Sequence, residues 1–136
     1  MKYQKYILLI VSFISFALAQ LPTNLNRNDS YIHSETIESS NEYLMNIILS
    51  SDTSWEENDN ESSVLTINVN NNYNQDIVIY NGSENHIYKQ MIGYLDQGVS
   101  NFEFYFDYNK SSSNASNIHI ESIEFIDTAT IDIDQD

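Results

Sequence analysis

The sequence predicts an all-β protein, a single antiparallel β-sandwich. Short runs of alternating apolar and polar residues recur along most of the chain, and segments rich in Asn, Asp, Ser and Gly separate them. No long amphipathic helix pattern interrupts these runs. At 136 residues, of which 41% are hydrophobic, the chain is long enough to bury one core of its own.

Residues 1–19 are typical of a secretory signal peptide. Two basic residues, Lys2 and Lys5, precede an apolar run over 7–17. Ala17-Leu18-Ala19 then places small residues where a signal peptidase cleaves. A retained membrane anchor needs about 20 apolar residues, and this run is shorter. We therefore expect cleavage and a secreted, extracellular protein with no membrane span in its mature form.

The charge balance excludes some classes of partner. The chain has 20 acidic and 5 basic residues, a formal charge of -15. The expected cleavage removes Lys2 and Lys5 but no acidic residue, so the mature charge is -17. Such a chain repels the phosphate backbone, which argues against a nucleic-acid partner. It contains no cysteine, so stability in an oxidising compartment must come from packing.

The chain divides into segments of different composition. Residues 20–40 are polar, contain the only proline and show no sustained period, which predicts a flexible N-terminal segment with one short strand near 31–37. Residues 41–127 carry the strand-like pattern and form the predicted β-sandwich domain. Residues 128–136 are predicted to be an acidic C-terminal tail or a final strand.

The first predicted strand of the sandwich, at 43–49, has an ambiguous pattern. Leu44, Ile47 and Ile48 also fit the apolar stripe of a helix. We favour a strand, because the segment is short and its neighbours are strands.

Two further strands are predicted at 64–69 and 76–80. In the first, apolar and polar residues alternate. The second runs into Asn81-Gly82, which favours a type I′ hairpin turn into a returning strand over 86–95. Asp96-Gln97-Gly98 then marks a second turn.

The clearest strand spans 101–108. One face of it is aromatic and is expected to enter the core: Phe102, Phe104, Phe106 and Tyr108. Near the C-terminus the apolar positions change register between Ile120 and Ile123, which predicts a β-bulge around Ser122.

The order of these segments resembles a galactose-binding-like jelly roll, a plan common among carbohydrate-binding modules of secreted polysaccharide-active enzymes. The resemblance covers roughly 54–126 and includes a leucine-x-x-glycine turn, Leu95 to Gly98. It rests on ESSVLTINV at 61–69, DIVIYNG at 76–82 and GYLDQGVSNFEF at 93–104. It implies a jelly-roll-like sandwich and a carbohydrate ligand, and it assigns no ligand-binding residue.

Trp55, the only tryptophan, lies in an acidic loop and is a candidate sugar-binding residue. Its indole face could stack on a sugar ring, with Asn58, Asp59 and Asn60 bonded to hydroxyl groups. The alternative is that the indole closes one end of the core. Four tyrosines are further candidates for ligand stacking, or else ordinary strand residues: Tyr73, Tyr80, Tyr88 and Tyr94. Among these we single out Tyr80 and Tyr88.

Acidic residues cluster in two places that could hold calcium, which prefers oxygen ligands. The clusters are Glu56, Glu57, Asp59 and Glu61, and Asp127, Asp132, Asp134 and Asp136. Neither has EF-hand spacing, and a frayed acidic tail explains the second equally well. A structural calcium ion is left open, and no other cofactor is expected.

The sequence predicts no enzyme. The three histidines lack the spacing of zinc ligands. No nucleophile elbow, phosphate loop or dinucleotide fingerprint is present in the sequence. Paired carboxylates could hydrolyse a glycosidic bond, but with 20 acidic residues some pair is inevitable.

Five Asn-x-Ser sequons predict a glycoprotein if the host glycosylates. They are Asn28, Asn60, Asn81, Asn109 and Asn114.

Together these observations predict a secreted, non-catalytic module that binds carbohydrate at a cell surface or in the extracellular matrix. One alternative is a structural glycoprotein that binds extracellular proteins and no sugar. Another is a lone accessory module of a carbohydrate-active protein.

Overall fold

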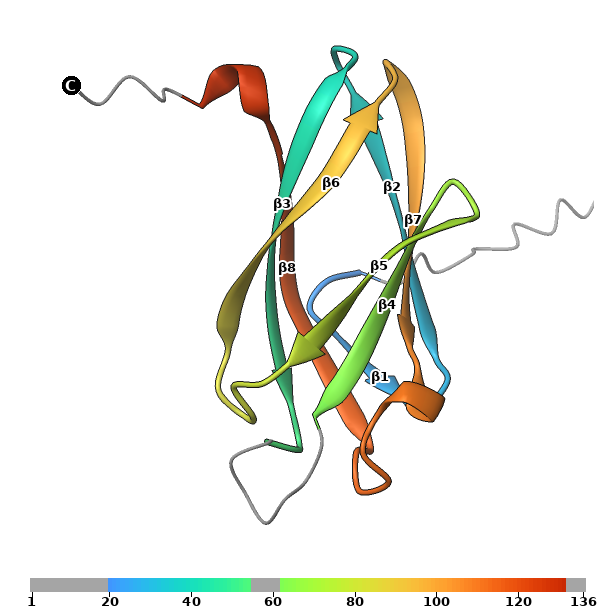
Figure 1. The fold of residues 1–136 in the computed structure, drawn as a ribbon, viewed down its shortest axis with the longest axis vertical. Coiled ribbons are helices and arrows are strands. Elements are labelled where there is room, and N and C mark those ends of the chain that lie inside the picture. The colour runs from blue at the N-terminus through green and yellow to red at the C-terminus, as the bar shows by residue number, and fades with distance from the viewer. Residues whose placement is uncertain (1–19, 55–61, 132–136) are drawn as a thin grey trace, which may run out of the picture.

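Most successive strands of the chain lie in opposite layers of a two-layer structure (Figure 1). The structure is a computed structural model that describes residues 20–54 and 62–131. Within these residues it contains eight strands: β1 (Thr23–Asn26), β2 (Ser30–Ile37), β3 (Asn41–Ser51), β4 (Ser63–Val69), β5 (Asn72–Ile79), β6 (His86–Leu95), β7 (Gly98–Phe106) and β8 (Asn117–Asp127). Two 3-10 helices, η1 (Tyr108–Lys110) and η2 (Thr128–Thr130), flank β8.

The strands form two four-stranded antiparallel sheets, which confirms the predicted β-sandwich. Sheet A has the order β1-β8-β3-β6, and sheet B has the order β2-β7-β4-β5. Only β4 and β5 are joined as a direct hairpin, because every other connection passes from one sheet to the other. The edge strands β5 and β6 lie along the same side of the sandwich, where side-chain amides of β5 donate hydrogen bonds to backbone carbonyls of β6.

The inner faces of the two sheets form one core. They supply the largest fully buried side chains, among them Phe102, Phe104 and Phe106 on β7 and Met45, Ile47 and Leu49 on β3. Each contributes about 1.5–3 kcal/mol by leaving water. The predicted aromatic face is confirmed for the three phenylalanines, whereas Tyr108 lies in η1 and is half-buried.

The segment that also fits a helix is a strand, β3. Its residues alternate between buried and half-buried positions. Leu44 and Ile48 face outward, and because they are apolar they imitate a helix stripe in the sequence.

The predicted bulge in β8 is confirmed. Ile48 pairs with Ser122, whereas the next residue, Leu49, pairs with Ile120. Glu121 is therefore the extra residue, and it allows apolar residues of both registers to face the core.

The prediction of a flexible segment over 20–40 is wrong, since these residues contain β1 and β2. The short strand predicted near 31–37 is present as β2, which pairs along its whole length with β7. The sandwich therefore begins before residue 41.

The predicted hairpin at Asn81-Gly82 is also wrong. Gly82 has a positive φ of 67°, as a turn residue would, but the segment carries the chain from sheet B to sheet A. The two-residue hairpin turn is Asn70-Asn71, between β4 and β5, with φ values of 49° and 66°. Positive φ at both central residues is the geometry of a type I′ turn, which asparagine tolerates.

Other predictions concern parts of the chain that are only partly described. Residues 1–19 and 132–136 lie outside the described residues, so the signal peptide stays a prediction. The start of the predicted C-terminal tail, Thr128–Thr130, is the 3-10 helix η2, capped by Asp127. Among the described residues, no helix has the length and apolarity needed to cross a membrane.

Candidate functional site

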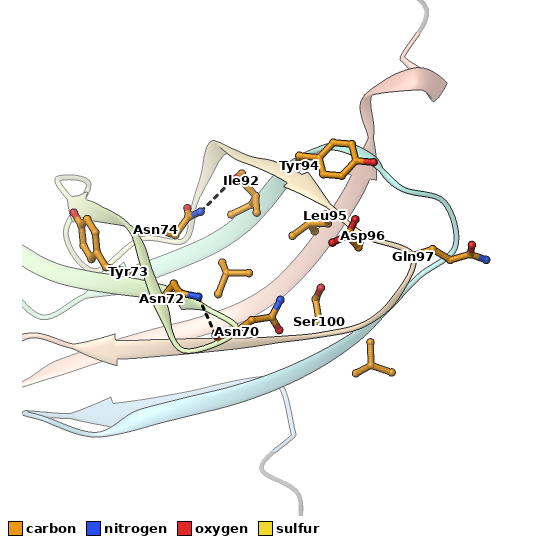
Figure 2. A pocket seen from close by; sticks show the side chains of 12 residues that line it. Asn70, Asn72, Tyr73, Asn74, Ile92, Tyr94, Leu95, Asp96, Gln97 and Ser100 are labelled. Carbon is orange, nitrogen blue, oxygen red and sulfur yellow. Dashed lines mark hydrogen bonds between the residues drawn. The ribbon is translucent and has the colours of Figure 1, made fainter.

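A pocket of about 440 Å³ opens on the side of the sandwich where β5 and β6 meet (Figure 2). Its walls come from the β4–β5 hairpin, the end of β6 and the connection to β7. The lining residues are Val69, Asn70, Asn72, Tyr73, Asn74, Ile92, Tyr94, Leu95, Asp96, Gln97, Val99 and Ser100. This volume lies in the range typical of small-molecule sites.

The first wall is the Asn70-Asn71 hairpin. The turn is held against β7, because the Asn70 N–H donates to the Asn101 carbonyl at 2.8 Å and the Asn70 Oδ1 accepts from the Asn101 N–H at 2.9 Å. Asn72 Nδ2 donates to the Asn70 carbonyl at 3.2 Å. The hairpin thus presents Asn72 and Tyr73 from a fixed backbone.

The second wall is the end of β6 and the loop that follows it. Gly93 and Gly98 have φ values of 102° and 124°, which side-chain-bearing residues rarely adopt. They allow the chain to bulge and then cross to sheet B, so Tyr94, Asp96 and Gln97 lie at the rim of the pocket. The loop is anchored where the Gln97 N–H donates to Ser40 Oγ at 2.8 Å.

The two walls are joined by side-chain amides. Asn74 Nδ2 donates to the Ile92 carbonyl and Gln75 Nε2 donates to the Met91 carbonyl, each at 2.9 Å. These bonds satisfy carbonyl groups on the free edge of β6, where no strand neighbours it. They also fix the distance between the two edges that enclose the pocket.

Two exposed tyrosines flank the pocket. Tyr73 is 63% exposed and comes from β5, whereas Tyr94 is 61% exposed and comes from β6. In the view of Figure 2 the Asn70 and Asn72 side chains lie between them. Exposed aromatic rings at a pocket rim offer flat apolar surfaces to a ligand.

Tyr73 also touches a charged cluster on the outer side of β5. The Lys110 ammonium lies 5.4 Å from the centre of the Tyr73 ring and 3.1 Å from a carboxylate oxygen of Asp76. Partial burial alone would raise the pKa of Asp76, but hydrogen bonds from Thr66 and Lys110 outweigh it and lower the pKa. The Tyr73 ring thus lies beside a cluster in which the positive charge of Lys110 offsets the negative charge of the Asp76 carboxylate.

The polar groups of the pocket are mostly neutral amides. Asp96 carries the only formal charge among the lining residues. Within the described part of the chain, the Tyr94 hydroxyl, the Asp96 carboxylate and the Gln97 amide make no side-chain hydrogen bond. These three groups can therefore bond to a ligand without breaking internal bonds.

The structure separates the candidate residues that the sequence suggests. Trp55, Asn58, Asp59 and Asn60 lie outside the described residues, so their roles stay predictions. Tyr80 and Tyr88 come together with their rings 5.2 Å apart, near His86 and away from the lining of the pocket.

Of that pair, Tyr88 is not placed to stack on a ligand. It is 4% exposed, and its hydroxyl accepts the Asn81 N–H at 3.2 Å. Tyr80 is partly exposed, but it bonds to His86 at 2.9 Å. Tyr73 and Tyr94, the other two tyrosines of the sequence-based set, line the pocket.

The sequence alone does not single out the pocket amides or Asp96 as site residues. A local signal exists only for the first wall, because two asparagines between strand-forming residues indicate a tight turn. No local signal indicates that this turn faces the end of β6.

Four predicted glycosylation sites are described, and all are exposed: Asn28, Asn81, Asn109 and Asn114. Each lies between strands, as surface sequons require. The Asn28 Oδ1 accepts a hydrogen bond from the Tyr105 hydroxyl at 2.9 Å, so that side chain has a structural role as well. Asn60 is outside the described residues, and glycosylation stays a prediction at all five.

The described residues do not form a carboxylate cluster suited to calcium. Within 20–54 and 62–131, no three His, Cys, Asp or Glu side chains come together. Asp127, the described member of the C-terminal acidic cluster, accepts hydrogen bonds from the Asn41 side chain and the Ala129 N–H. The other cluster, at 56–61, lies outside the described residues.

Comparison with known proteins shows a likeness in fold. No protein-family model matches the chain, and no curated protein matches it in sequence. The carbohydrate-binding module CBM36, solved in complex with calcium and xylotriose, has a TM-score of 0.58 at 12% identity, over 76% of this chain and 78% of that one.

Two further solved structures are similar. A CBM36 domain of a multidomain xylanase from the hindgut metagenome of Trinervitermes trinervoides has a TM-score of 0.58 at 12% identity, over 79% of this chain and 86% of that one. A family 35 carbohydrate-binding module from an environmental isolate has a TM-score of 0.57 at 14% identity, over 74% and 67%. The chain therefore has the jelly-roll β-sandwich fold found in carbohydrate-binding modules, as its sequence predicts.

Proposed function

We propose that this chain is a secreted, non-catalytic carbohydrate-binding module whose pocket between β5 and β6 binds an uncharged glycan. The observation that carries the proposal is the pair of exposed tyrosines, Tyr73 and Tyr94, on either side of a pocket lined with amides. Sugars combine apolar ring faces with many hydroxyl groups. Aromatic rings and neutral amides are the side chains that match both features.

The free groups of the pocket suit hydroxyl recognition. The Asp96 carboxylate accepts hydrogen bonds, and the Gln97 amide both donates and accepts them. The Tyr94 hydroxyl also serves in both directions. Because each sugar hydroxyl is both donor and acceptor, such a mixed set can bond to neighbouring hydroxyls on one ring.

Charge favours neutral glycans over acidic ones. The lining contains no Lys or Arg, and its one charged residue is Asp96. A uronate or sulfate group entering the pocket would meet this carboxylate within a protein of net charge -15. Acidic polysaccharides are therefore expected to bind weakly.

The pocket chemistry also supports a role without catalysis. The common routes of glycoside hydrolysis use two carboxyl groups on opposite sides of the scissile bond. Asp96 is the only carboxylate that lines this pocket. Calcium enters the proposal only as a condition to vary, because the described residues hold no fitting cluster.

The test is affinity electrophoresis of the chain from residue 20 onward in gels containing soluble polysaccharides. Neutral xylan, mannan, β-glucan and galactan are compared with anionic polygalacturonate, with calcium and with chelator. We expect retardation by at least one neutral polymer. Tyr94→Ala should weaken binding about tenfold, since such a ring contact is worth about 1 kcal/mol or more.

Two variants serve as controls. Tyr80→Ala removes a partly exposed tyrosine outside the pocket lining, and it should leave affinity unchanged. Trp55→Ala tests the sequence-based expectation of a tryptophan platform. If Tyr94→Ala has no effect while Trp55→Ala abolishes binding, the pocket assignment is wrong. If no glycan retards the folded protein, the structural-glycoprotein alternative replaces the proposal.

A further inference from the structure

The outer face of sheet A carries apolar side chains on three adjacent strands. We call this surface the β3 face. It consists of Leu44, Asn46 and Ile48 on β3, Ile87, Lys89 and Met91 on β6, and Ser122, Glu124 and Ile126 on β8. In Figure 1 these three strands lie together in one layer.

The strand register arranges the β3 face into three cross-strand rows. One row is Ile126–Leu44–Met91, and another is Ser122–Ile48–Ile87. Between them lies the row Glu124–Asn46–Lys89. Two mainly apolar rows thus enclose a polar row with one negative and one positive end.

The apolar residues of this face are accessible. Met91 is 56% exposed and Ile87 is 50% exposed, whereas Leu44 and Ile48 are half-buried by their neighbours. Contiguous exposed apolar surface is uncommon on soluble monomers and marks interaction sites. The described sequon asparagines all lie in connections between strands, so glycans there would not start from this face.

The outer face of sheet B has a different character. Ser30 Oγ donates to Glu103, Ser34 Oγ donates to Asn101, and Asn68 Nδ2 donates to Glu103, at 2.6–2.9 Å. This network satisfies its own polar groups and suits contact with water. Sheet B also exposes Ile32, Val78 and Val99, but they lie on three different strands and do not pair with one another, so the two outer faces of the sandwich are not equivalent.

The polar row of the β3 face has groups without partners. Within the described residues, neither Lys89 nor Glu124 forms an ion pair or a side-chain hydrogen bond. They are two strand spacings apart, roughly 10 Å, too far to pair with each other. Asn46 Oδ1, between them, is covered and has no hydrogen-bond partner, which is costly for a polar atom.

We propose that the β3 face binds the β3 face of a second copy of this chain, about a two-fold axis that runs parallel to β3. Rotation about this axis places β6 of one copy over β8 of the other. Lys89 then faces Glu124 of the second copy, twice in the dimer. The apolar rows face each other, with Leu44 against Leu44 and Met91 against Ile126.

Charge selects this axis. A two-fold axis perpendicular to the strands in the plane of the interface would place Lys89 over Lys89 and Glu124 over Glu124. Like charges in contact are unfavourable, whereas the axis along β3 gives opposite charges at both ends of the row. A two-fold interface must be self-complementary, and the β3 face is self-complementary only when the axis runs parallel to β3.

Asn46 lies on the axis and gains a partner there. The χ2 torsion of asparagine is soft, so its amide can turn Oδ1 outward at small cost. The two Asn46 amides, facing each other, can then donate and accept in a reciprocal pair. This pairing gives a partner to the one buried polar side-chain atom of the β3 face that lacks a hydrogen bond in the described structure.

The net charge of the protein explains why this face would be used. Two copies of the chain from residue 20 onward, each of net charge -17, repel each other over most of their surfaces. The nine residues of the β3 face include one Lys and one Glu and so carry no net charge, while Glu42, beside Leu44 on the same side of β3, adds a negative charge at its edge. Association should be measured near about 0.15 M salt, where the long-range repulsion is screened within about 8 Å.

The experiment is sedimentation equilibrium of the chain from residue 20 onward, from micromolar to submillimolar concentration. We expect a monomer–dimer equilibrium in this range. Met91→Glu should abolish it, because it places a carboxylate in the apolar row. Ile32→Glu is the matched control, since Ile32 is 57% exposed on the outer face of sheet B, and it should leave the equilibrium unchanged.

Charge exchange tests the axis itself. Lys89→Glu and Glu124→Lys should each weaken the dimer by about tenfold, because each creates two like-charge contacts. The double variant restores both pairs with the signs exchanged, so its dissociation constant should return to within about threefold of the original. Circular dichroism and thermal melts establish that every variant is folded.

Several results would overturn the proposal. One is a wild-type chain that stays monomeric over the whole concentration range, even if another protein binds the face. Another is a dimer that Ile32→Glu disrupts as strongly as Met91→Glu. If the double charge exchange does not restore association, the stated axis is wrong.

Discussion

The side chain of Asn74 on β5 donates a hydrogen bond to the backbone carbonyl of Ile92 on β6, with 2.9 Å between the nitrogen and the oxygen. The two residues belong to different sheets. A side-chain amide therefore takes the place of a neighbouring strand at the edge of β6. It closes one side of the sandwich directly beneath the candidate glycan pocket.

Removal of this bridge should loosen the pocket and destabilise the fold. Asn74→Ala leaves the Ile92 carbonyl without its donor, which should lower the free energy of unfolding by about 1 kcal/mol. Urea denaturation measures the loss. Asn72→Ala is the control, because its amide bonds only to the exposed Asn70 carbonyl, and it should cost less than about 0.5 kcal/mol. Equal losses in the free energy of unfolding for the two variants would show that the hydrogen bond between Asn74 and Ile92 contributes no more than the exposed one.

The β4–β5 turn should depend on a residue that tolerates positive φ. Asn71 has a φ of 66°, which a β-branched residue adopts only at a cost of about 1–2 kcal/mol. We expect Asn71→Val to lower stability by that amount and Asn71→Gly to be close to neutral. Denaturant midpoints compare the two variants. A stable Asn71→Val would contradict the type I′ geometry.

The aromatic row of β7 should dominate the stability of the core. Phe104 is fully buried, so Phe104→Ala should cost about 3–5 kcal/mol through lost burial and the cavity that remains. Its neighbour Tyr105 points to the opposite face and is half-exposed. Tyr105→Ala should cost far less, and similar losses at both positions would mean that the register of β7 is wrong. Denaturation curves provide both values.

The Asp52 carboxylate should make stability depend on acid pH. Partial burial alone would raise its pKa, but hydrogen bonds from Ser116 and Asn117 outweigh it and lower the pKa in the folded state. The ionised carboxylate therefore stabilises the fold above the unfolded-state pKa of about 4. As the pH falls from there through the lower folded-state pKa, this contribution is lost.

The measurement is the free energy of unfolding between neutral and acid pH for the wild type and Asp52→Asn. The difference between the two should be largest near neutral pH and should shrink below about pH 4. The wild type must be compared with Asp52→Asn because protonation of the other acidic residues also changes the free energy of unfolding, by relieving charge repulsion. Asp96→Asn, at an exposed loop position, controls for the removal of one charge. A difference that stays constant with pH would exclude the assigned role of Asp52.

The local sequence pattern was sufficient to predict a strand where one face of the strand is clearly apolar. The alternation at Phe102, Phe104 and Phe106 predicts β7, and the alternation at Leu65 and Ile67 predicts β4, because a half-buried strand has period two. The bulge in β8 was also visible, since a register change in the apolar residues has few other causes.

Local pattern predicted a short strand at β2 but placed it within a flexible segment, for a specific reason. Two of its core-side positions are occupied by His33 and Glu35, whose side chains lie 2.7 Å apart, and the His33 ring stacks on Phe125 with 5.8 Å between centres. These polar residues find partners only in the folded protein. In the sequence they break the apolar alternation, and the segment resembles a flexible arm.

The pocket was partly predictable. Tyr73 and Tyr94 belong to the tyrosines that the sequence marks as ligand candidates, but the two singled out from the sequence are Tyr80 and Tyr88, which lie outside the pocket lining. Burial excludes Tyr88, which is enclosed, whereas the exposed Tyr80 differs from Tyr94 by its place outside the pocket lining. The burial of a side chain depends on which strands pack against each other, and this packing involves residues that are distant in the sequence.

Composition and local pattern were enough to predict the all-β class, the strong negative charge and the approximate positions of the strands within 41–127, since each depends on residue content or on neighbours along the chain. Which sheet each strand joins depends on the tertiary structure. That choice rests on pairings between distant segments, and it brings the edge of β5 beside the edge of β6. The pocket exists only because these two edges meet, so no local pattern could have located it.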